Sequence, residues 1–125
     1  MKKSIFITGS EGFIGSHIVE KLIKKNFNIN ALVLYNSFGS IGNLELLPKE
    51  YLKKINIIFG NLQDGSTYEK YLDKNSYVIN SASLISIPYS YRASFSYFQN
   101  NLLGAHTLFN LCLKKKSKKS NPFLH

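Results

Sequence analysis

The sequence is poor in the residues that mark secreted and membrane-spanning proteins. Its 125 residues include one cysteine, Cys112, and no tryptophan. A lone cysteine cannot form an internal disulfide, and no charged segment followed by an apolar run precedes Ile5, as it would in a signal peptide. No apolar run approaches the roughly twenty residues that a membrane-spanning helix needs. We therefore expect a protein of the reducing cytoplasm that makes no membrane contact.

Acidic residues are also scarce, since 7 Asp and Glu face 16 Lys and Arg and leave a formal net charge of +9. An excess of lysine can serve nucleic-acid binding, because it displaces counterions from phosphates. Here, however, five basic residues lie together in 114–119 and the others are scattered along the chain. This distribution is typical of a solvated surface with a basic tail, so we expect no nucleic-acid partner.

Apolar residues are plentiful, at 44% of the chain, and they are arranged in two alternating patterns. Short runs typical of strands buried in a sheet occupy 3–9, 28–35, 55–60 and 76–83. Stretches with helical spacing or helix-forming composition occupy 14–25, 44–54, 66–72 and 93–116. The alternation predicts an α/β fold, a Rossmann-type doubly wound parallel sheet with right-handed crossovers. We expect Ser66 or Thr67 to cap the helix of 66–72.

Three glycines lie in the turn between the first predicted strand and the first predicted helix. Gly9, Gly12 and Gly15 are spaced three residues apart in TGSEGFIG. Such a turn brings backbone N–H groups and the positive end of a helix against a pyrophosphate, and side chains would block that approach. The alternative is a tight turn with one packing glycine, but the position between strand and helix favours dinucleotide binding. A mononucleotide P-loop is excluded, because the Gly-Lys-Ser/Thr ending is missing.

The segment TGSEGFIGSH resembles the TGxxGFIGxH start of the extended short-chain dehydrogenase/reductases. This family includes nucleotide-sugar epimerases and 4,6-dehydratases. The resemblance implies a domain that binds NAD or NADP through Gly9, Gly12, Phe13, Ile14 and Gly15. It therefore implies a nicotinamide dinucleotide as the partner of this chain.

Three later segments fit the same family in order. GNLQD is similar to the family's G-D-x-x-D, which implies that Asp64 lies by the adenine with Leu62 beside it. NSAS resembles H-x-A-A, which implies that Ala82 and Ser83 let the nicotinamide ribose approach. NNLLGAHTL resembles the T-N-V-x-G-T-x-N helix and matches it at Asn101.

Two further segments resemble a narrower group within the family. ALVLYNSFGS and SLISIPYSY look like parts of bacterial sugar-nucleotide 4,6-dehydratases that make legionaminic-acid-type sugars. The substrate of those enzymes is an N-acetylglucosamine nucleotide. The resemblance therefore implies a substrate of this type for a full-length form.

The end of the second predicted strand departs from the usual pattern. NAD-binding members place an acidic residue there for the adenosine ribose, whereas this chain has Tyr35 and no acidic residue in 21–44. An NADP enzyme would place an arginine or lysine nearby for the 2′-phosphate, and 26–48 contains neither. Asn36 and Ser37 could bond the ribose or simply form a turn. The choice between NAD and NADP stays open at this point.

The catalytic pair of the family is missing from the sequence. Its reaction uses a Tyr-x-x-x-Lys motif, in which the lysine lowers the pKa of the tyrosine, and none of the eight tyrosines has a lysine four residues on. We therefore expect no catalytic residues here and a nucleotide-sugar substrate only in a full-length form. His17 and His106 have no second histidine or carboxylate at metal spacing, so no metal site is expected either.

The C-terminal segment continues none of these patterns. We expect 1–116 to be an incomplete NAD(P)-binding Rossmann domain and 117–125 to be an aberrant tail. A frameshift in an adenine-rich run would explain the tail, because the shifted codons can read KVKKVIHSS, a basic helix end followed by a β-branched strand. The chain then derives from a nucleotide-sugar dehydratase or epimerase and is inactive alone. The alternative is a stand-alone, non-catalytic dinucleotide-binding or regulatory module.

Overall fold

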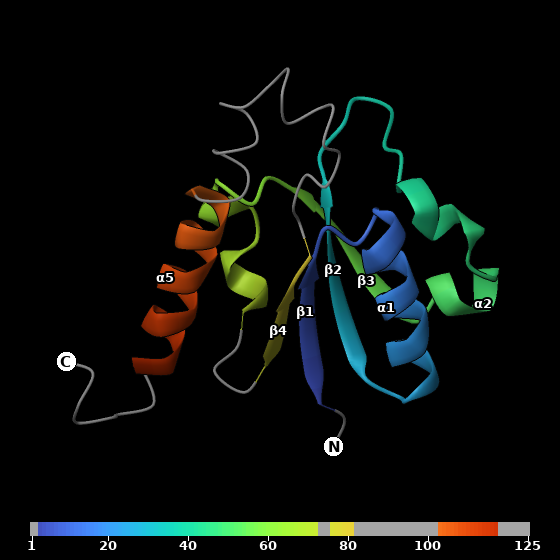
Figure 1. Ribbon diagram of the computed structural model, residues 1–125, viewed down its shortest axis with the longest axis horizontal. Helices are drawn as coiled ribbons and strands as arrows, with labels where there is room; N and C mark the ends of the chain where they lie inside the picture. The colour runs from blue at the N-terminus through green and yellow to red at the C-terminus, as the bar shows by residue number, and fades with distance from the viewer. Residues whose placement is uncertain (1–2, 73–75, 82–102, 118–125) are drawn as a thin grey trace.

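The computed structural model describes residues 3–72, 76–81 and 103–117 (Figure 1). Its strands are β1 (Ser4–Thr8), β2 (Asn28–Leu34), β3 (Ile55–Gly60) and β4 (Tyr77–Asn80). Its helices are α1 (Phe13–Lys24), α2 (Lys49–Leu52) and α5 (Gly104–Ser117), with 3-10 turns η1 (Gly42–Leu46), η2 (Gly65–Thr67) and η3 (Glu69–Tyr71). The predictions for Ala82, Ser83, Asn101 and 118–125 lie outside the described residues.

The four strands form one parallel sheet in the order β3-β2-β1-β4. Ile5 of β1 pairs with Ile29 of β2 on one side and with Tyr77 of β4 on the other. The chain builds outward from β1 through β2 to β3 and then crosses to the opposite side of β1. The direction of winding therefore reverses between β1 and β4, which makes the carboxyl ends of these two strands the topological switch point.

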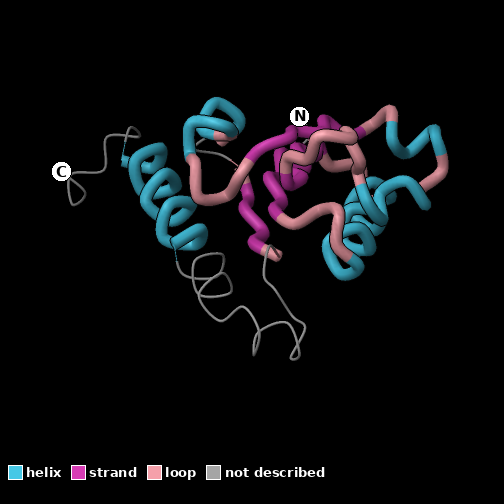
Figure 2. Tube along the Cα trace, turned by 90° about the horizontal axis from the view of Figure 1, so that it is seen from above, coloured by secondary structure: helices cyan, strands magenta, loops and turns pink. Residues whose placement is uncertain are grey.

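Helices cover both faces of the sheet, as the sequence predicted. α1 and α2 lie on one side of the strands and α5 on the other, and the two perpendicular views agree on this arrangement (Figures 1 and 2). Contacts of α1 with β1, β2 and η1 form one layer, while α5 contacts η2 on the opposite face. The doubly wound α/β architecture is confirmed.

Side chains of each strand alternate between two apolar clusters. On the α1 face the buried cluster comprises Ile7, Val19, Ile23, Ile29, Ala31, Val33, Leu44, Leu47 and Ile55. On the α5 face it comprises Phe6, Leu32, Ile58, Leu62, Tyr68, Leu72 and Leu108. Consecutive residues of β1 thus enter different clusters, as expected for a strand covered on both faces. This sandwiched packing holds the carboxyl ends of the strands in one row.

The segment 66–72 differs from the prediction. It forms two 3-10 turns instead of one helix, and the residue that caps the first turn is Asp64. The Asp64 carboxylate accepts hydrogen bonds from the amide and the hydroxyl of Ser66, at 3.1 and 2.6 Å. The Thr67 hydroxyl instead donates to the Asp64 carbonyl at 2.7 Å. An aspartate at this position accepts the amide two residues ahead, so the turn begins earlier than predicted.

None of the helices in the described part of the chain has the length and apolar character needed to cross a membrane.

Candidate dinucleotide-binding site

The glycine turn follows directly from β1, and two of its glycines are required by the fold. Gly9 has a φ of 63°, a left-handed conformation that side chains disfavour. A Cβ atom on Gly15 would lie 2.2 Å from the Gly9 carbonyl oxygen, far inside contact distance. The N-terminus of α1 therefore packs directly on the turn. Replacing either glycine would disturb the packing of the chain itself.

Gly12 is different, because the protein itself leaves room for a side chain there. Its backbone is extended, with a φ of −75°, and a Cβ would lie 3.4 Å from the Gly9 carbonyl oxygen, an ordinary contact. No side chain caps α1 at this residue. The first amides of the helix, on Phe13 and Ile14, have no carbonyl partner within the helix. The turn thus presents N–H groups and the positive end of a 12-residue helix beside a residue that carries no side chain.

Polar groups join the carboxyl ends of β1 and β4 below this turn. The Thr8 hydroxyl donates to the Asn80 side-chain carbonyl at 2.6 Å and accepts from the Ser81 amide at 3.1 Å. The Ser81 hydroxyl donates to the Thr8 carbonyl. It also lies where a Cβ on Gly15 would approach it to 3.0 Å. These contacts hold the switch point and the start of α1 together.

On its other side, the turn is tied to β2. The amide of the buried Ser10 donates to the Leu32 carbonyl at 3.2 Å. The amide of Leu34, the last residue of β2, donates to Oε2 of Glu11 at 3.1 Å, and the Glu11 carbonyl accepts from the Asn43 amide at 2.9 Å. Sequence reasoning missed Glu11, because it sought an acidic residue only along β2. The feature of the sequence that could have identified it is the presence of an acidic residue between Gly9 and Gly12.

The loop after β2 is organised by Asn36. Its Oδ1 accepts from the amides of Phe38 and Ser40 at 3.2 and 2.8 Å. Its Nδ2 donates to the carbonyls of Leu34 and Ser40 at 3.3 and 2.9 Å. Both amide hydrogens are therefore used within the loop, so Asn36 forms the turn. Ser37 is exposed in the same loop, and ribose binding by either residue stays a prediction.

The two residues predicted near the adenine lie after β3, at the same edge of the sheet as the glycine turn. Leu62 is buried in the α5-face cluster, and its carbonyl accepts from the Tyr68 hydroxyl at 2.7 Å. Asp64 is exposed and caps η2. Leu62 therefore anchors the segment after β3 in the core, while Asp64 is exposed to solvent.

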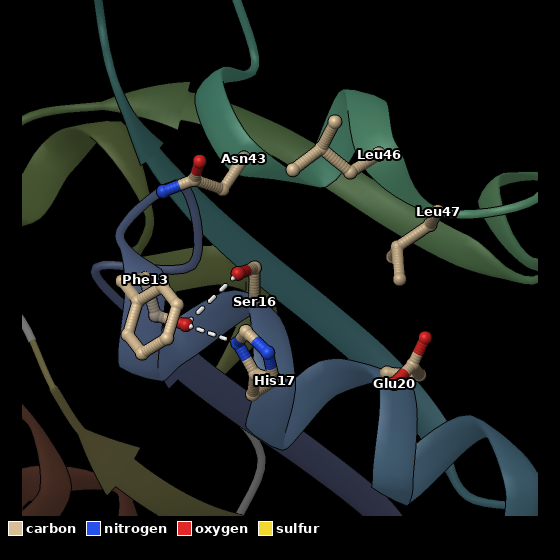
Figure 3. Close-up of a pocket in the computed structure, with 7 residues that line it drawn as sticks. All are labelled: Phe13, Ser16, His17, Glu20, Asn43, Leu46 and Leu47. Atoms are coloured by element: carbon tan, nitrogen blue, oxygen red, sulfur yellow. Dashed lines mark hydrogen bonds between the residues drawn. The ribbon is translucent and has the colours of Figure 1, made fainter.

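A small hollow of about 130 Å³ lies between α1 and η1 (Figure 3). It is lined by Phe13, Ser16, His17, Glu20, Asn43, Leu46 and Leu47. The Phe13 ring lies 4.5 Å from the His17 ring, centroid to centroid, and the Phe13 carbonyl oxygen lies 2.7 Å from His17 Nδ1. The Phe13 side chain therefore belongs to this hollow. Only its backbone amide lies at the glycine turn, at the N-terminus of α1. Within 3–72, 76–81 and 103–117, no three His, Cys, Asp or Glu residues are grouped as a metal site.

A doubly wound parallel sheet, a glycine turn at its switch point and an uncapped helix N-terminus together define a Rossmann-type domain. The family model of GDP-mannose 4,6 dehydratase matches residues 6–125. The chain belongs to this family of nucleotide-sugar dehydratases and epimerases, within the extended short-chain dehydrogenase/reductases.

Relatives from different organisms support this assignment. The chain is 35% identical to dTDP-D-glucose 4,6-dehydratase of Dictyostelium discoideum over 94% of its own length and 27% of that protein. It is similar to the structure of UDP-N-acetylglucosamine 4-epimerase from Methanobrevibacter ruminantium (34% identity, TM-score 0.75, 92% of this chain and 36% of that one). A Thermus thermophilus UDP-glucose 4-epimerase in complex with NAD is also similar (27% identity, TM-score 0.71, 90% and 34%). The chain spans about a third of the length of these relatives.

Proposed function

We propose that this chain is the NAD(P)-binding, N-terminal part of a nucleotide-sugar 4,6-dehydratase or epimerase, and that it binds a nicotinamide dinucleotide at the glycine turn. The observation that carries the proposal is Gly12. Gly9 and Gly15 are explained by the fold, whereas the space beside Gly12 would hold a Cβ without conflict. A glycine that the chain does not need is accounted for by a ligand that approaches the backbone from outside.

In this proposal the pyrophosphate lies at the N-terminus of α1, against the amides of Phe13 and Ile14. The adenosine extends toward the carboxyl ends of β2 and β3, with Asp64 near the adenine. The nicotinamide half extends toward β4, where Ala82 and Ser83 follow in the sequence. A bound nicotinamide would supply the hydride acceptor and donor. The residues of this chain bind and orient the cofactor.

The chain alone is proposed to be inactive, because its sequence contains no Tyr-x-x-x-Lys pair. A sugar nucleotide would then be converted only by a longer form that supplies this pair. An N-acetylglucosamine nucleotide is the proposed substrate class. It is supported by the segments ALVLYNSFGS and SLISIPYSY and by the similarity to the Methanobrevibacter epimerase, whose name specifies such a sugar.

Titration of NADH into the wild-type chain and into Gly12→Ala tests the proposed site. The alanine Cβ fits within the protein, so the thermal midpoint should stay almost unchanged. NADH affinity should fall on the order of tenfold, because the methyl group occupies the space of the pyrophosphate. Fluorescence of the bound nicotinamide and calorimetry measure the two effects.

Gly15→Ala is the matched control for this experiment. The same added methyl group should lower the thermal midpoint, because it would lie 2.2 Å from the Gly9 carbonyl oxygen. Equal NADH affinity for wild type and Gly12→Ala, or no binding by either protein, would refute the proposed function.

A further inference from the structure

We propose that the Glu11 carboxylate selects NAD over NADP in this chain, by accepting a hydrogen bond from the adenosine ribose and by repelling a 2′-phosphate. This inference rests on the proposed dinucleotide site and adds the specificity of that site. It assigns to the glycine turn a role that dinucleotide-binding folds usually give to an acidic residue at the end of β2.

The position of the Glu11 carboxylate supports this role. Glu11 is remote from the end of β2 in the sequence, by 23 residues, yet its Oε2 accepts the Leu34 amide at 3.1 Å. Leu34 is the last residue of β2. A negative charge therefore lies at the carboxyl end of β2, next to the glycine turn. Tyr35 occupies the position at which dinucleotide-binding folds usually have an acidic residue, and its side chain is uncharged.

The second carboxylate oxygen lacks a partner within the described residues. Oε1 of Glu11 is buried and accepts no hydrogen bond there, although the residue as a whole is only half-buried. A buried acceptor without a donor costs free energy. A carboxylate offers about four lone-pair sites, of which the Leu34 amide uses one. The lone pairs that Oε2 keeps beside the Leu34 amide are acceptor sites for a ribose hydroxyl at the turn.

Contacts from η1 hold the backbone of Glu11 in place. The Asn43 amide donates to the Glu11 carbonyl at 2.9 Å. Gly42 packs so closely that a Cβ on it would lie 2.8 Å from the Glu11 carbonyl oxygen and 2.9 Å from the Glu11 Cβ. With a φ of 57°, Gly42 also adopts the left-handed conformation that brings η1 against the turn. The carboxylate is thus set in its position by the fold.

The surrounding sequence offers no cation that would bind a 2′-phosphate. Residues 26–48 contain no lysine or arginine. Asn36, two residues beyond the end of β2, uses both of its amide hydrogens on the carbonyls of Leu34 and Ser40. A phosphate placed a few ångströms from the Glu11 carboxylate would therefore be repelled with no positive side chain of 26–48 to offset the repulsion.

The test compares NADH and NADPH titrations of the wild-type chain, Glu11→Gln and Glu45→Gln at low and high salt. We expect wild type to prefer NADH by about tenfold or more at low salt. Glu11→Gln, which keeps the shape of the side chain and removes its charge, should bring the two affinities together, mainly by strengthening NADPH binding. Glu45 is an exposed carboxylate of η1, so Glu45→Gln makes the same change in net charge and should leave the preference intact.

The salt dependence of the wild type provides a readout that needs no variant. Repulsion between two charged groups is screened by salt, so the preference for NADH should shrink as the ionic strength rises. Equal wild-type affinities for NADH and NADPH, or an unchanged preference in Glu11→Gln, would overturn this inference alone. Failure of the wild type to bind either nucleotide would overturn the proposed function and this inference with it.

Discussion

Among single residues, Tyr68 shows how strongly the α5-face cluster constrains a polar group. The side chain is fully buried, and its ring stacks on Phe6 with 5.4 Å between the centroids. Its hydroxyl donates to the Leu62 carbonyl at 2.7 Å. Burial raises the pKa of Tyr68 to about 12, with smaller contributions from the nearby Cys112 and Asp64. The hydroxyl therefore stays protonated and keeps its hydrogen bond well into alkaline solution.

This pKa predicts a loss of stability at high pH. In the unfolded chain Tyr68 ionises near its ordinary pKa of 10.0, whereas in the folded chain it ionises near 12. As the pH rises between these values the unfolded state releases a proton that the folded state retains, so the free energy of unfolding falls. Tyr68→Phe should lack this part of the pH dependence. Near neutral pH it should be less stable than wild type by about 1 kcal/mol, since the Leu62 carbonyl loses its donor.

Urea unfolding of wild type and Tyr68→Phe at neutral pH and at several pH values above 10 measures both effects. All other ionisable groups are the same in both proteins, so the difference between the two curves isolates the tyrosine. Parallel curves would contradict the assignment.

At the scale of elements, α5 is positioned by two glycines that allow close approach. A Cβ on Gly104, the first residue of α5, would lie 2.9 Å from a methyl group of Leu62. A Cβ on Gly65 of η2 would lie 2.7 Å from a methyl group of Leu111. The helix therefore packs on the segment after β3 with little space between them. This packing also fixes the position of the segment after β3, which contains Asp64.

Gly104→Val should consequently lower the stability of the domain. The added methyl groups overpack the contact with Leu62, at an expected cost of about 1–3 kcal/mol. Lys114→Ala is the matched change on the same helix. It removes the exposed ion pair between Lys114 and Glu69, 3.0 Å long, and should cost about 1 kcal/mol or less. Chemical denaturation ranks the two variants, and an equal or larger loss for Lys114→Ala would show that charge rather than packing holds α5.

For the molecule as a whole, the side of the sheet at β4 carries exposed apolar surface. Within the described residues β4 pairs with β1 alone. Beside β4 lies an open hollow of about 540 Å³, lined by Val78, Asn80, Ala105, His106, Leu108, Phe109 and Cys112. Apolar hollows of this kind favour association between molecules.

We therefore expect the isolated chain to self-associate at moderate ionic strength. Phe109 lines the hollow and is 63% exposed, so Phe109→Lys should reduce association without disturbing the core. Phe38 is 92% exposed and lies in the loop after β2, outside that hollow, so Phe38→Lys adds the same charge elsewhere and should have little effect. Sedimentation over a range of concentrations reports the result. A wild-type chain that stays monomeric throughout would contradict the expectation.

The sequence by itself determined the fold class and the location of the glycine turn. Both depend on local information, because strand and helix periodicities and the order strand, turn, helix can be read from neighbouring residues. The four strands accordingly lie within the predicted segments, and the described helices α1 and α5 each extend one residue beyond theirs. The cap at Asp64 was mispredicted, since competing hydroxyl and carboxylate caps within four residues differ only in local geometry.

The tertiary structure alone decided which residues of the turn serve the fold and which are available to a ligand. Three equally spaced glycines look alike in the sequence, but the distances to the Gly9 carbonyl separate Gly12 from Gly15. Likewise, no pattern places the Glu11 carboxylate on the last amide of β2, because that contact joins residues that only the parallel pairing of β1 and β2 brings together. Contacts between remote segments depend on the packing of whole elements, and this is why the role proposed for Glu11 could be inferred only from the folded chain.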